Sequence, residues 1–434
     1  MTLFTAPFRP WPSVSAPPRP TGPMAARAAE RGDSAGHQRL LKGINRMALV
    51  RHLCANPGLS RADLATSVQL TKSTVGLLVR ELIAEGWLLE RESVATGDLG
   101  RRPTPLYIDP ARLLLLGAEI GIEAVRVVAT SLVGEVVASV TVSHGANRGA
   151  NACIDRLTKA LLKVRAQLDG AAQEVIGVGV GLPGGVDEST GFLHFAPNLG
   201  WRDVAFGAQL EAALVNSSLA GVPLFLQNEA DVAALGELEF AEGTASDPLV
   251  YVSINHGVGA GVIVDDRLLT GSRGFAGEIG HTILERNGPP CSCGRRGCAE
   301  ALIGVRAMLP ATSTKSRETT PMADLARRLA AKDEAVTRSV EKAGDFLGTL
   351  LQNLAAAYDP ACIVLGGAVA ELGDPFVQPA LRSLRDHCAA ANLPVPTVRL
   401  SQFGADAVAI GAAALVRYRL TRPLIAATSS KAIA

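Results

Sequence analysis

The 434-residue chain lacks several features that would assign it to a simple class of protein. It has no run of about 18 apolar residues, so no segment is predicted to span a membrane. No basic start leads into an apolar run, so no secretion signal is predicted. The net charge is only +1, so any surface for nucleic acid must be local. Seven cysteines, an odd number with three in one cluster, favour metal binding in a reducing cytoplasm over a set of disulfides.

Residues 278–300 (EIGHTILERNGPPCSCGRRGCAE) hold the strongest motif of the chain. His281, Cys291, Cys293 and Cys298 have the order and spacing of metal ligands, and four nitrogen and sulfur donors are typical of a closed structural zinc site. The Gly-Arg-Arg-Gly between the last two cysteines lets the backbone turn so that both thiolates face one ion. Zinc is therefore the predicted cofactor. Four protein ligands leave no position for water, which disfavours a catalytic zinc, and a loop of free thiols is the remaining alternative.

The length of the chain predicts two or three domains. Residues 1–36 are rich in Pro, Ala and Arg and are predicted to be a disordered tail, because they have too little apolar area to bury. Residues 37–110 are predicted to form a winged helix-turn-helix domain with a linker. Residues 111–434 are predicted to form a two-lobed α/β domain with a cleft between the lobes and a zinc loop at 281–298.

Three helices are predicted in the N-terminal domain. The first is amphipathic and ends at Asn56-Pro57-Gly58. The second begins at Ser60, where Asp63 three residues later completes a capping box. The third begins at the N-cap Thr71 and ends at Gly86. Two short helices joined by a tight turn are typical of a helix-turn-helix.

The third helix is the predicted recognition helix, because its first turn is small or cationic and can approach the major groove of DNA. Residues 87–94 and 95–108 follow as a strand and a returning hairpin, which together predict a wing. The residues predicted to contact DNA are Thr71, Lys72, Ser73, Thr74 and Arg80, with Arg101 and Arg102 of the wing suited to phosphate or minor-groove contacts. A small helical oligomerisation module is the alternative.

The rest of the chain reads as two similar halves. Each half has a β-meander followed by helices: three strands between 113 and 142 and a helix over 151–169, then two strands over 248–271 and a long helix over 337–360. This plan is that of the actin-like ATPase fold, also described as ribonuclease-H-like, whose ligand cleft lies between the lobes.

The chain resembles the ROK family (repressor, open reading frame, kinase), and specifically its transcriptional regulators. The resemblance covers about residues 40–415. It rests on the stretch from Glu278-Ile279-Gly280-His281 to Cys298, on Ala196-Pro197-Asn198-Leu199-Gly200-Trp201, and on Asn228-Glu229. It implies a sugar kinase or a sugar-responsive repressor. The residues that it implies for sugar binding are Asn228, Glu229, Glu278, His281 and Glu300, with the histidine touching both zinc and sugar.

The sequence departs from the family's kinases in three places, which involve four residues and lie on the expected nucleotide side. Glu229 stands where the kinases have an aspartate acting as general base, and the extra methylene displaces the carboxylate by about 1 Å, a misplacement that can cost roughly 100-fold in rate. In the loop matching Asp-x-Gly-Gly-Thr, Ile122 replaces a glycine and Glu123 adds negative charge where phosphate would lie. Ala368 replaces the third glycine of a later turn. The predicted protein is therefore a kinase-derived regulator that has lost phosphotransfer.

We expect a cytoplasmic repressor that binds operator DNA as a homodimer or tetramer and responds to a monosaccharide. Xylose, glucose and N-acetylglucosamine remain open as effectors. The alternatives are an active sugar kinase with a regulatory N-terminal domain and a zinc-stabilised scaffold. Two other residues favour structural roles: His256 lies in a glycine turn and is expected to make a local hydrogen bond. Asp231 is expected to start a helix rather than to touch ligand.

Overall fold

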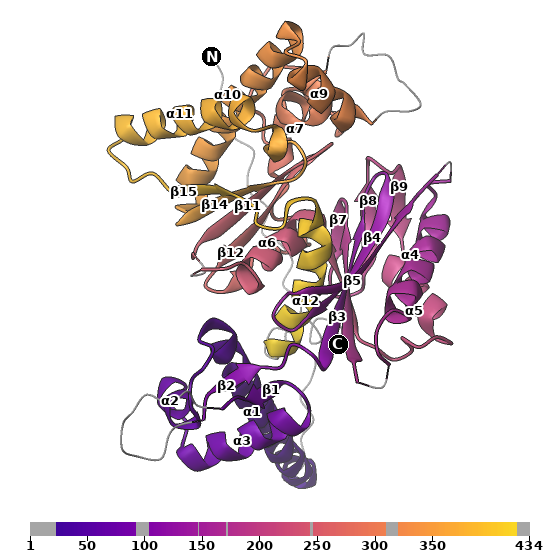
Figure 1. The fold of residues 1–434 in the computed structure, drawn as a ribbon, viewed down its shortest axis with the longest axis vertical. Coiled ribbons are helices and arrows are strands. Elements are labelled where there is room, and N and C mark those ends of the chain that lie inside the picture. The colour runs from indigo at the N-terminus through magenta and orange to yellow at the C-terminus, as the bar shows by residue number, and fades with distance from the viewer. Residues whose placement is uncertain are drawn as a thin grey trace.

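The computed structural model describes residues 23–92, 104–145, 147–170, 172–243, 246–309 and 320–422, with side chains from residue 38 onwards. It shows a small N-terminal domain followed by two lobes (Figure 1). Each lobe is built on a five-stranded sheet. None of the helices in these ranges is both long and apolar enough to cross a membrane.

The N-terminal domain has the predicted winged helix-turn-helix plan. Its elements are α1 (Pro23–Ala55), α2 (Arg61–Ser67), α3 (Lys72–Ala84), β1 (Leu88–Glu90) and β2 (Leu106–Ile108), the two strands pairing antiparallel. The capping box of Ser60 and Asp63 is confirmed, as is the N-cap Thr71. The prediction of a disordered tail over 1–36 is wrong for residues 23–36, which are the first turns of α1. The alanines and arginines there favour a helix that continues into the packed part of α1.

The sheet of the first lobe contains a three-stranded meander with two parallel strands added at its other edge. Its strand order is β10-β6-β3-β4-β5, where β3, β4 and β5 run antiparallel and β6 and β10 run parallel to β3. Helices α4 and α5 cover one face (Figure 1). The elements of this lobe are β3 (Leu113–Ile120), β4 (Ala124–Ser131), β5 (Val136–Ser143), α4 (Ala150–Arg165), β6 (Glu174–Leu182), β7 (Gly185–Asp187), β8 (Phe192–Ala196), β9 (Trp201–Val204), α5 (Phe206–Leu214) and β10 (Leu224–Asn228).

The second lobe repeats this arrangement with the order β13-β12-β11-β14-β15, so the prediction of two similar halves is confirmed. Helices α10 and α11 pack against its sheet (Figure 1). The elements of this lobe are β11 (Leu249–Ile254), β12 (Val258–Val264), β13 (Arg267–Leu268), η1 (Ile279–His281), α7 (Ala299–Ile303), α8 (Val305–Met308), α9 (Pro321–Ala330), α10 (Glu334–Tyr358), β14 (Cys362–Gly366), η2 (Ala370–Leu372), α11 (Asp374–Ala390), β15 (Thr397–Leu400) and η3 (Gly404–Asp406).

Two helices cross between the lobes and join them. Helix α6 (Glu229–Glu239) follows β10 of the first lobe but packs on β12 of the second, and α12 (Ala407–Thr421) follows β15 of the second lobe but packs on the first sheet. A Cβ atom at Gly179 of β6 would lie 1.8 Å from the carbonyl oxygen of Ala412, so only glycine allows α12 to approach this closely. Figure 1 shows α12 at the centre of the molecule, between the lobes and above the N-terminal domain.

The N-terminal domain packs directly on the first lobe and α12. One continuous apolar cluster contains Leu49, Leu78 and Leu106 of the domain together with Leu115 of β3 and Val416 of α12. Its members are almost wholly buried. The winged helix-turn-helix domain is therefore seated on the two-lobed domain and not only linked to it by the chain.

Candidate functional site

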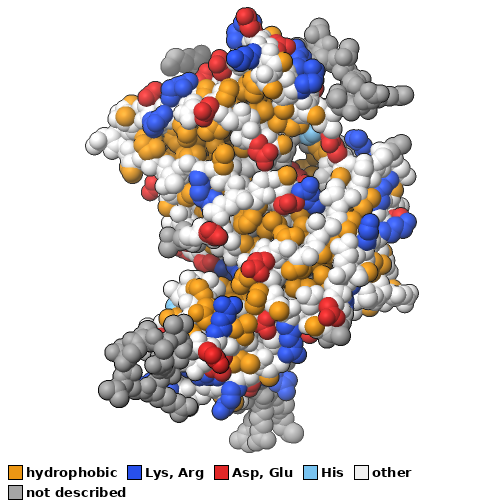
Figure 2. Space-filling model, viewed as in Figure 1, with side chains coloured by type: hydrophobic (Ala, Val, Ile, Leu, Met, Phe, Trp, Pro, Cys, Tyr) orange, Lys and Arg blue, Asp and Glu red, His pale blue; other side chains and the backbone are white. Residues whose placement is uncertain are grey.

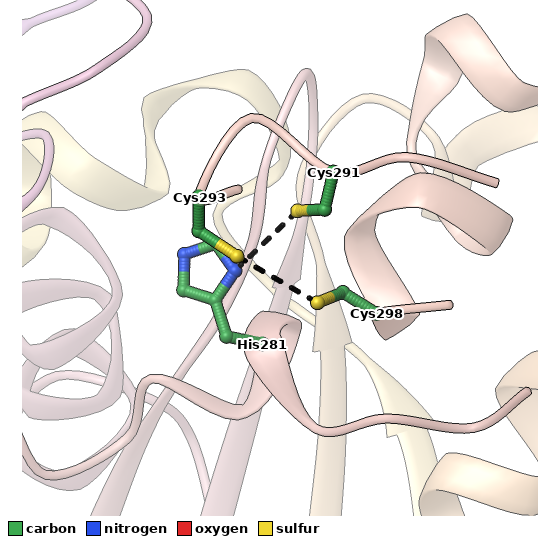
Figure 3. Close-up of side chains that lie close together, drawn as sticks. All are labelled: His281, Cys291, Cys293 and Cys298. Carbon is green, nitrogen blue, oxygen red and sulfur yellow. Dashed lines mark hydrogen bonds between the residues drawn. The ribbon is translucent and has the colours of Figure 1, made fainter. Parts of the chain in front are cut away.

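The predicted metal ligands come together at one point of the second lobe. One donor atom from each of His281, Cys291, Cys293 and Cys298 lies within 4.8 Å of the others. The Cys291 sulfur is 3.7 Å from His281 Nδ1, and the sulfurs of Cys293 and Cys298 are 3.7 Å apart. Figure 3 shows the four side chains converging from η1, the cysteine loop and the start of α7.

The geometry and chemistry of these four residues fit zinc. A tetrahedral zinc with bonds of about 2.3 Å to sulfur holds its sulfurs roughly 3.8 Å apart. Backbone hydrogen bonds also shape the loop: the Cys291 amide donates to the Arg295 carbonyl at 2.8 Å, and the Gly297 amide to the Pro289 carbonyl at 2.8 Å. These bonds turn the loop so that its donor atoms lie close to one another.

All five residues predicted to bind sugar line one small cavity beside this cluster. Asn228, Glu229, Glu278, His281 and Glu300 surround a volume of about 70 Å³. His281 connects the two sites: its Nδ1 faces Cys291, and its Nε2 lies 3.9 Å from a Glu278 carboxylate oxygen. We call this cavity the inner pocket.

The inner pocket is built from rigid backbone. Asn228 is the N-cap of α6: its side-chain oxygen accepts from the Ala230 amide at 2.7 Å, and its side-chain nitrogen donates to the Gly184 carbonyl at 2.9 Å. Glu300 lies in the first turn of α7 and accepts a hydrogen bond of 2.8 Å from Ser292. Carboxylates and an amide held in this way suit a ligand that is rich in hydroxyl groups.

The carboxylates of the inner pocket affect one another. Burial, together with the charges of Glu278 and Glu300, raises the pKa of Glu229 to about 7. Burial also raises the pKa of Glu278, which His281 opposes and Glu300 reinforces. A ligand hydroxyl would therefore meet a Glu229 side chain that can either donate or accept near neutral pH.

A second cavity of about 500 Å³ adjoins the inner pocket, and we call it the outer cavity. Glu119, Ile122, Glu123 and Ala368 line it, and Glu229 lines both cavities. Burial, followed by the charge of Glu229, raises the pKa of Glu119 to about 7. The positions that the resemblance assigns to the nucleotide side thus gather at one place, where carboxylates, when ionised, would repel a phosphate.

Two further contacts in the outer cavity bear on phosphate binding. The amide of Ala368 donates to the side chain of Asn255 at 2.8 Å, so this amide is already bonded. The cation of Arg126 pairs with Asp406. His256 also lines the cavity, and burial, followed by the charge of Arg306, lowers its pKa. Among the described residues, none forms a hydrogen bond with the His256 ring, so the local hydrogen bond expected for this histidine is not observed.

The structure adds residues that the sequence did not single out for the site. Asn198 lines both cavities, and Ser292 lines the inner pocket. Asn198 belongs to the motif Ala196–Trp201, which is the signal that could have identified it. Asp231 is buried in the first turn of α6 and does not line either cavity, which agrees with its expected structural place.

The predicted recognition helix presents its polar side outwards. Thr71 caps α3 and bonds Ser73 and Thr74, while Val75, Leu78, Val79 and Leu82 face the core. Lys72, Ser73 and Arg80 are exposed, and so is Leu77, which the sequence reasoning did not select. Arg101 and Arg102 lie outside the described residues.

Comparison with known proteins assigns the family. The model of the ROK family matches residues 115–419. The chain belongs to the ROK family. A winged helix-turn-helix DNA-binding model matches residues 44–88, within the N-terminal domain.

ROK proteins of two kinds are similar to this chain. The xylose repressor of Bacillus subtilis (strain 168) is 30% identical over 347 residues, covering 80% of this chain and 87% of the repressor. The glucokinase of Halalkalibacterium halodurans is 30% identical over 321 residues, covering 70% of this chain and 94% of the glucokinase. The latter match leaves a larger part of this chain uncovered.

Among solved structures, a ROK family transcriptional regulator described as a homolog of the E. coli MLC protein aligns with a TM-score of 0.72 at 23% identity. It covers 90% of this chain and 100% of that one, so the whole architecture is shared. A ROK family glucokinase from Streptomyces griseus, in complex with glucose and AMPPNP, aligns with a TM-score of 0.60 at 25% identity over 70% of this chain and 99% of that one.

Proposed function

We propose that this ROK protein is a sugar-responsive transcriptional repressor that has lost phosphotransfer. The observation that carries the proposal is the contrast within one cleft: the five sugar-side residues share the inner pocket, whereas the outer cavity carries Ile122, Glu123 and Ala368. The similarity to a repressor over 80% of the chain and the separate match of a winged helix-turn-helix model to residues 44–88 support the same function.

In this proposal α3 binds the major groove of an operator through Thr71, Lys72, Ser73, Thr74 and Arg80. A homodimer would place two such helices on a two-fold site. Arg101 and Arg102 remain candidates for backbone contacts. Zinc at the cysteine loop would keep His281 and Glu300 in place for the sugar, as an ordering metal that takes no part in chemistry.

The sugar would bind in the inner pocket and shift the balance between two arrangements of the lobes. It can do so only if it binds one arrangement better than the other. The carboxylates of the pocket and the Asn228 amide would form hydrogen bonds with the hydroxyl groups of the sugar, whichever arrangement it favours. Xylose and N-acetylglucosamine each differ from glucose at one position of the ring, and each of the three sugars remains a candidate effector.

A mobility-shift titration tests the proposal. The purified chain is titrated on DNA from upstream of its own gene, with and without each of these sugars, and Glu278→Ala is the comparison variant. We expect a specific shift that one sugar alters in the wild type and not in Glu278→Ala, while Glu278→Ala still binds the DNA. An unchanged sugar response in Glu278→Ala would refute the assigned pocket, and the absence of any specific shift would refute the repressor.

The second candidate function is an ATP-dependent sugar kinase. It is favoured by the glucokinase of which 94% is matched and by the presence of a carboxylate, Glu229, where the two cavities meet. Sugar-dependent release of ADP from the purified chain would establish it.

A further inference from the structure

Helix α6 has one end in the inner pocket and the other end beside the DNA-binding domain. At its first residues, Asn228 and Glu229 line the pocket. At its last residue, Glu239, it accepts hydrogen bonds of 2.6 Å from Arg417 and 2.6 Å from Arg422. Eleven residues span about 16 Å, so one short helix joins the two places.

This helix cannot slide or turn on its own. Its residues from Ala230 to Glu237 are all buried, so every face of the helix has packed neighbours. A Cβ atom at Gly411 of α12 would lie 2.0 Å from the Val232 carbonyl oxygen, which places the two helix backbones in direct contact. A displacement at the pocket end of α6 must therefore carry α12 along with it.

The charged groups at the far end continue the connection to the N-terminal domain. Arg422, which directly follows α12, also binds Asp266 in the β12–β13 turn, with contacts of 2.6 and 3.1 Å. Arg51 of α1 lies 3.7 Å from the same carboxylate. Glu239, Arg417 and Arg422 are nearly inaccessible to solvent, whereas Arg51 and Asp266 are exposed. We call these five residues the junction cluster.

The contact between the N-terminal domain and the junction cluster is loosely packed on one side. A cavity of about 730 Å³ lies there, lined by α1 residues such as Arg51 and Cys54 and by Glu239, Arg417 and Arg422. Arg51 with Asp266 is the one ion pair between the N-terminal domain and the lobes among the described residues. The space allows α1 to change its position there, while the apolar cluster with Leu115 and Val416 keeps the domain attached.

We propose that α6 transmits the state of the inner pocket to the DNA-binding domain through the junction cluster, with Glu239 as its main positioning residue. Glu239 holds Arg417 and Arg422 together, and these arginines fix the end of α12 against α6. Asp266 and Arg51 then orient α1. The proposal rests on the proposed function, since it names how the same pocket would regulate DNA binding.

The test measures coupling, defined as the ratio of operator Kd with and without sugar. Operator is DNA from upstream of the chain's own gene, and the probes are xylose, glucose and N-acetylglucosamine. In Glu239→Gln we expect sugar affinity by calorimetry within about threefold of wild type, and coupling reduced at least tenfold. In Arg51→Gln, which removes only the exposed pair, we expect a smaller loss of coupling with the same sugar affinity.

A matched control uses the same helix. Arg399 of β15 forms an ion pair of 2.7 Å with Glu237 of α6, away from the N-terminal domain, so Arg399→Gln perturbs α6 comparably but should keep the wild-type coupling. Wild-type coupling in both Glu239→Gln and Arg51→Gln, or a loss in Arg399→Gln as large as in Glu239→Gln, would overturn the proposal. A wild type that binds operator but ignores every sugar would instead refute the proposed function from which the inference starts.

Discussion

The inner pocket and the outer cavity share Pro183, Asn198, Glu229 and Gly257, yet the rest of their linings differ in chemistry. The inner pocket has amide and carboxylate groups held by helix starts and by the cysteine loop. The outer cavity has carboxylates at the β3–β4 turn and an amide already bonded to Asn255. Apart from these shared residues, different loops line the two cavities, so substitutions in one cavity can leave the lining of the other unchanged. The ROK fold can therefore give rise to both kinases and regulators.

Among the changes that test the contrast between the two cavities, loss of the metal should have the largest effect on sugar affinity. We expect Cys298→Ser to lose zinc and to lower sugar affinity on the order of 100-fold, because His281 and Glu300 would lose their support. Metal content by mass spectrometry and sugar affinity by calorimetry measure both effects. The control Cys388→Ala removes a buried thiol of the second lobe outside the cluster and should keep both. Wild-type sugar affinity in zinc-free Cys298→Ser would mean that sugar binding in the inner pocket does not depend on the metal.

The next effect concerns one carboxylate of the inner pocket. Glu278→Gln keeps the shape of the side chain but removes a charged acceptor, and a hydrogen bond to a charged group contributes about 1.5–3 kcal/mol. Sugar affinity should therefore fall by roughly 10- to 100-fold, with operator affinity unchanged. If Glu278→Gln bound sugar as tightly as the wild type, the Glu278 charge would not contribute to sugar binding, and the contrast between the two cavities would lose this support.

A smaller effect concerns pH and the outer cavity. The pKa of Glu119 is about 7 in the folded protein and about 4.3 in an unfolded chain, so the folded state holds the proton more tightly. Its ionisation therefore lowers the free energy of unfolding as the pH rises from about 4 to about 7. Glu119→Gln removes this cost, so its Tm should exceed that of the wild type by a few degrees at pH 8.

The difference in Tm between Glu119→Gln and the wild type should become smaller as the pH falls towards 4.5. Thermal unfolding across this range measures the difference, and Glu135→Gln, at an exposed position in the turn between β4 and β5, is the control that should follow the wild type. A constant difference at all pH values would mean that Glu119 does not act through ionisation.

The smallest effect is expected at Glu123, which is exposed on the outer cavity only. Glu123→Gln should leave sugar affinity within about threefold of the wild type, because the carboxylate does not line the inner pocket. Calorimetry with the effector sugar provides the measurement. A loss of sugar affinity as large as that in Glu278→Gln would mean that the two cavities form one sugar-binding site.

Much of the fold follows from local patterns in the sequence. Ser60 with Asp63 and Thr71 mark helix starts that the structure confirms, and the apolar runs from Leu113 give the strands of both meanders. The helical start at Pro23 was not predicted. It depends on continuity with a helix whose later turns are packed, which composition alone does not reveal.

The sequence by itself was enough to predict His281, Cys291, Cys293 and Cys298 as a ligand set, because chelation by a short loop depends on spacing within a few residues, and the structure brings these four side chains together. It also determined the departures at Ile122, Glu123 and Glu229, since these are changes of residue type. The tertiary structure alone decided that Asn228 and Glu300, 72 positions apart in the numbering, line one pocket. It also decided that Glu239 lies between Arg417 and Arg422, because that contact depends on two helices crossing between the lobes.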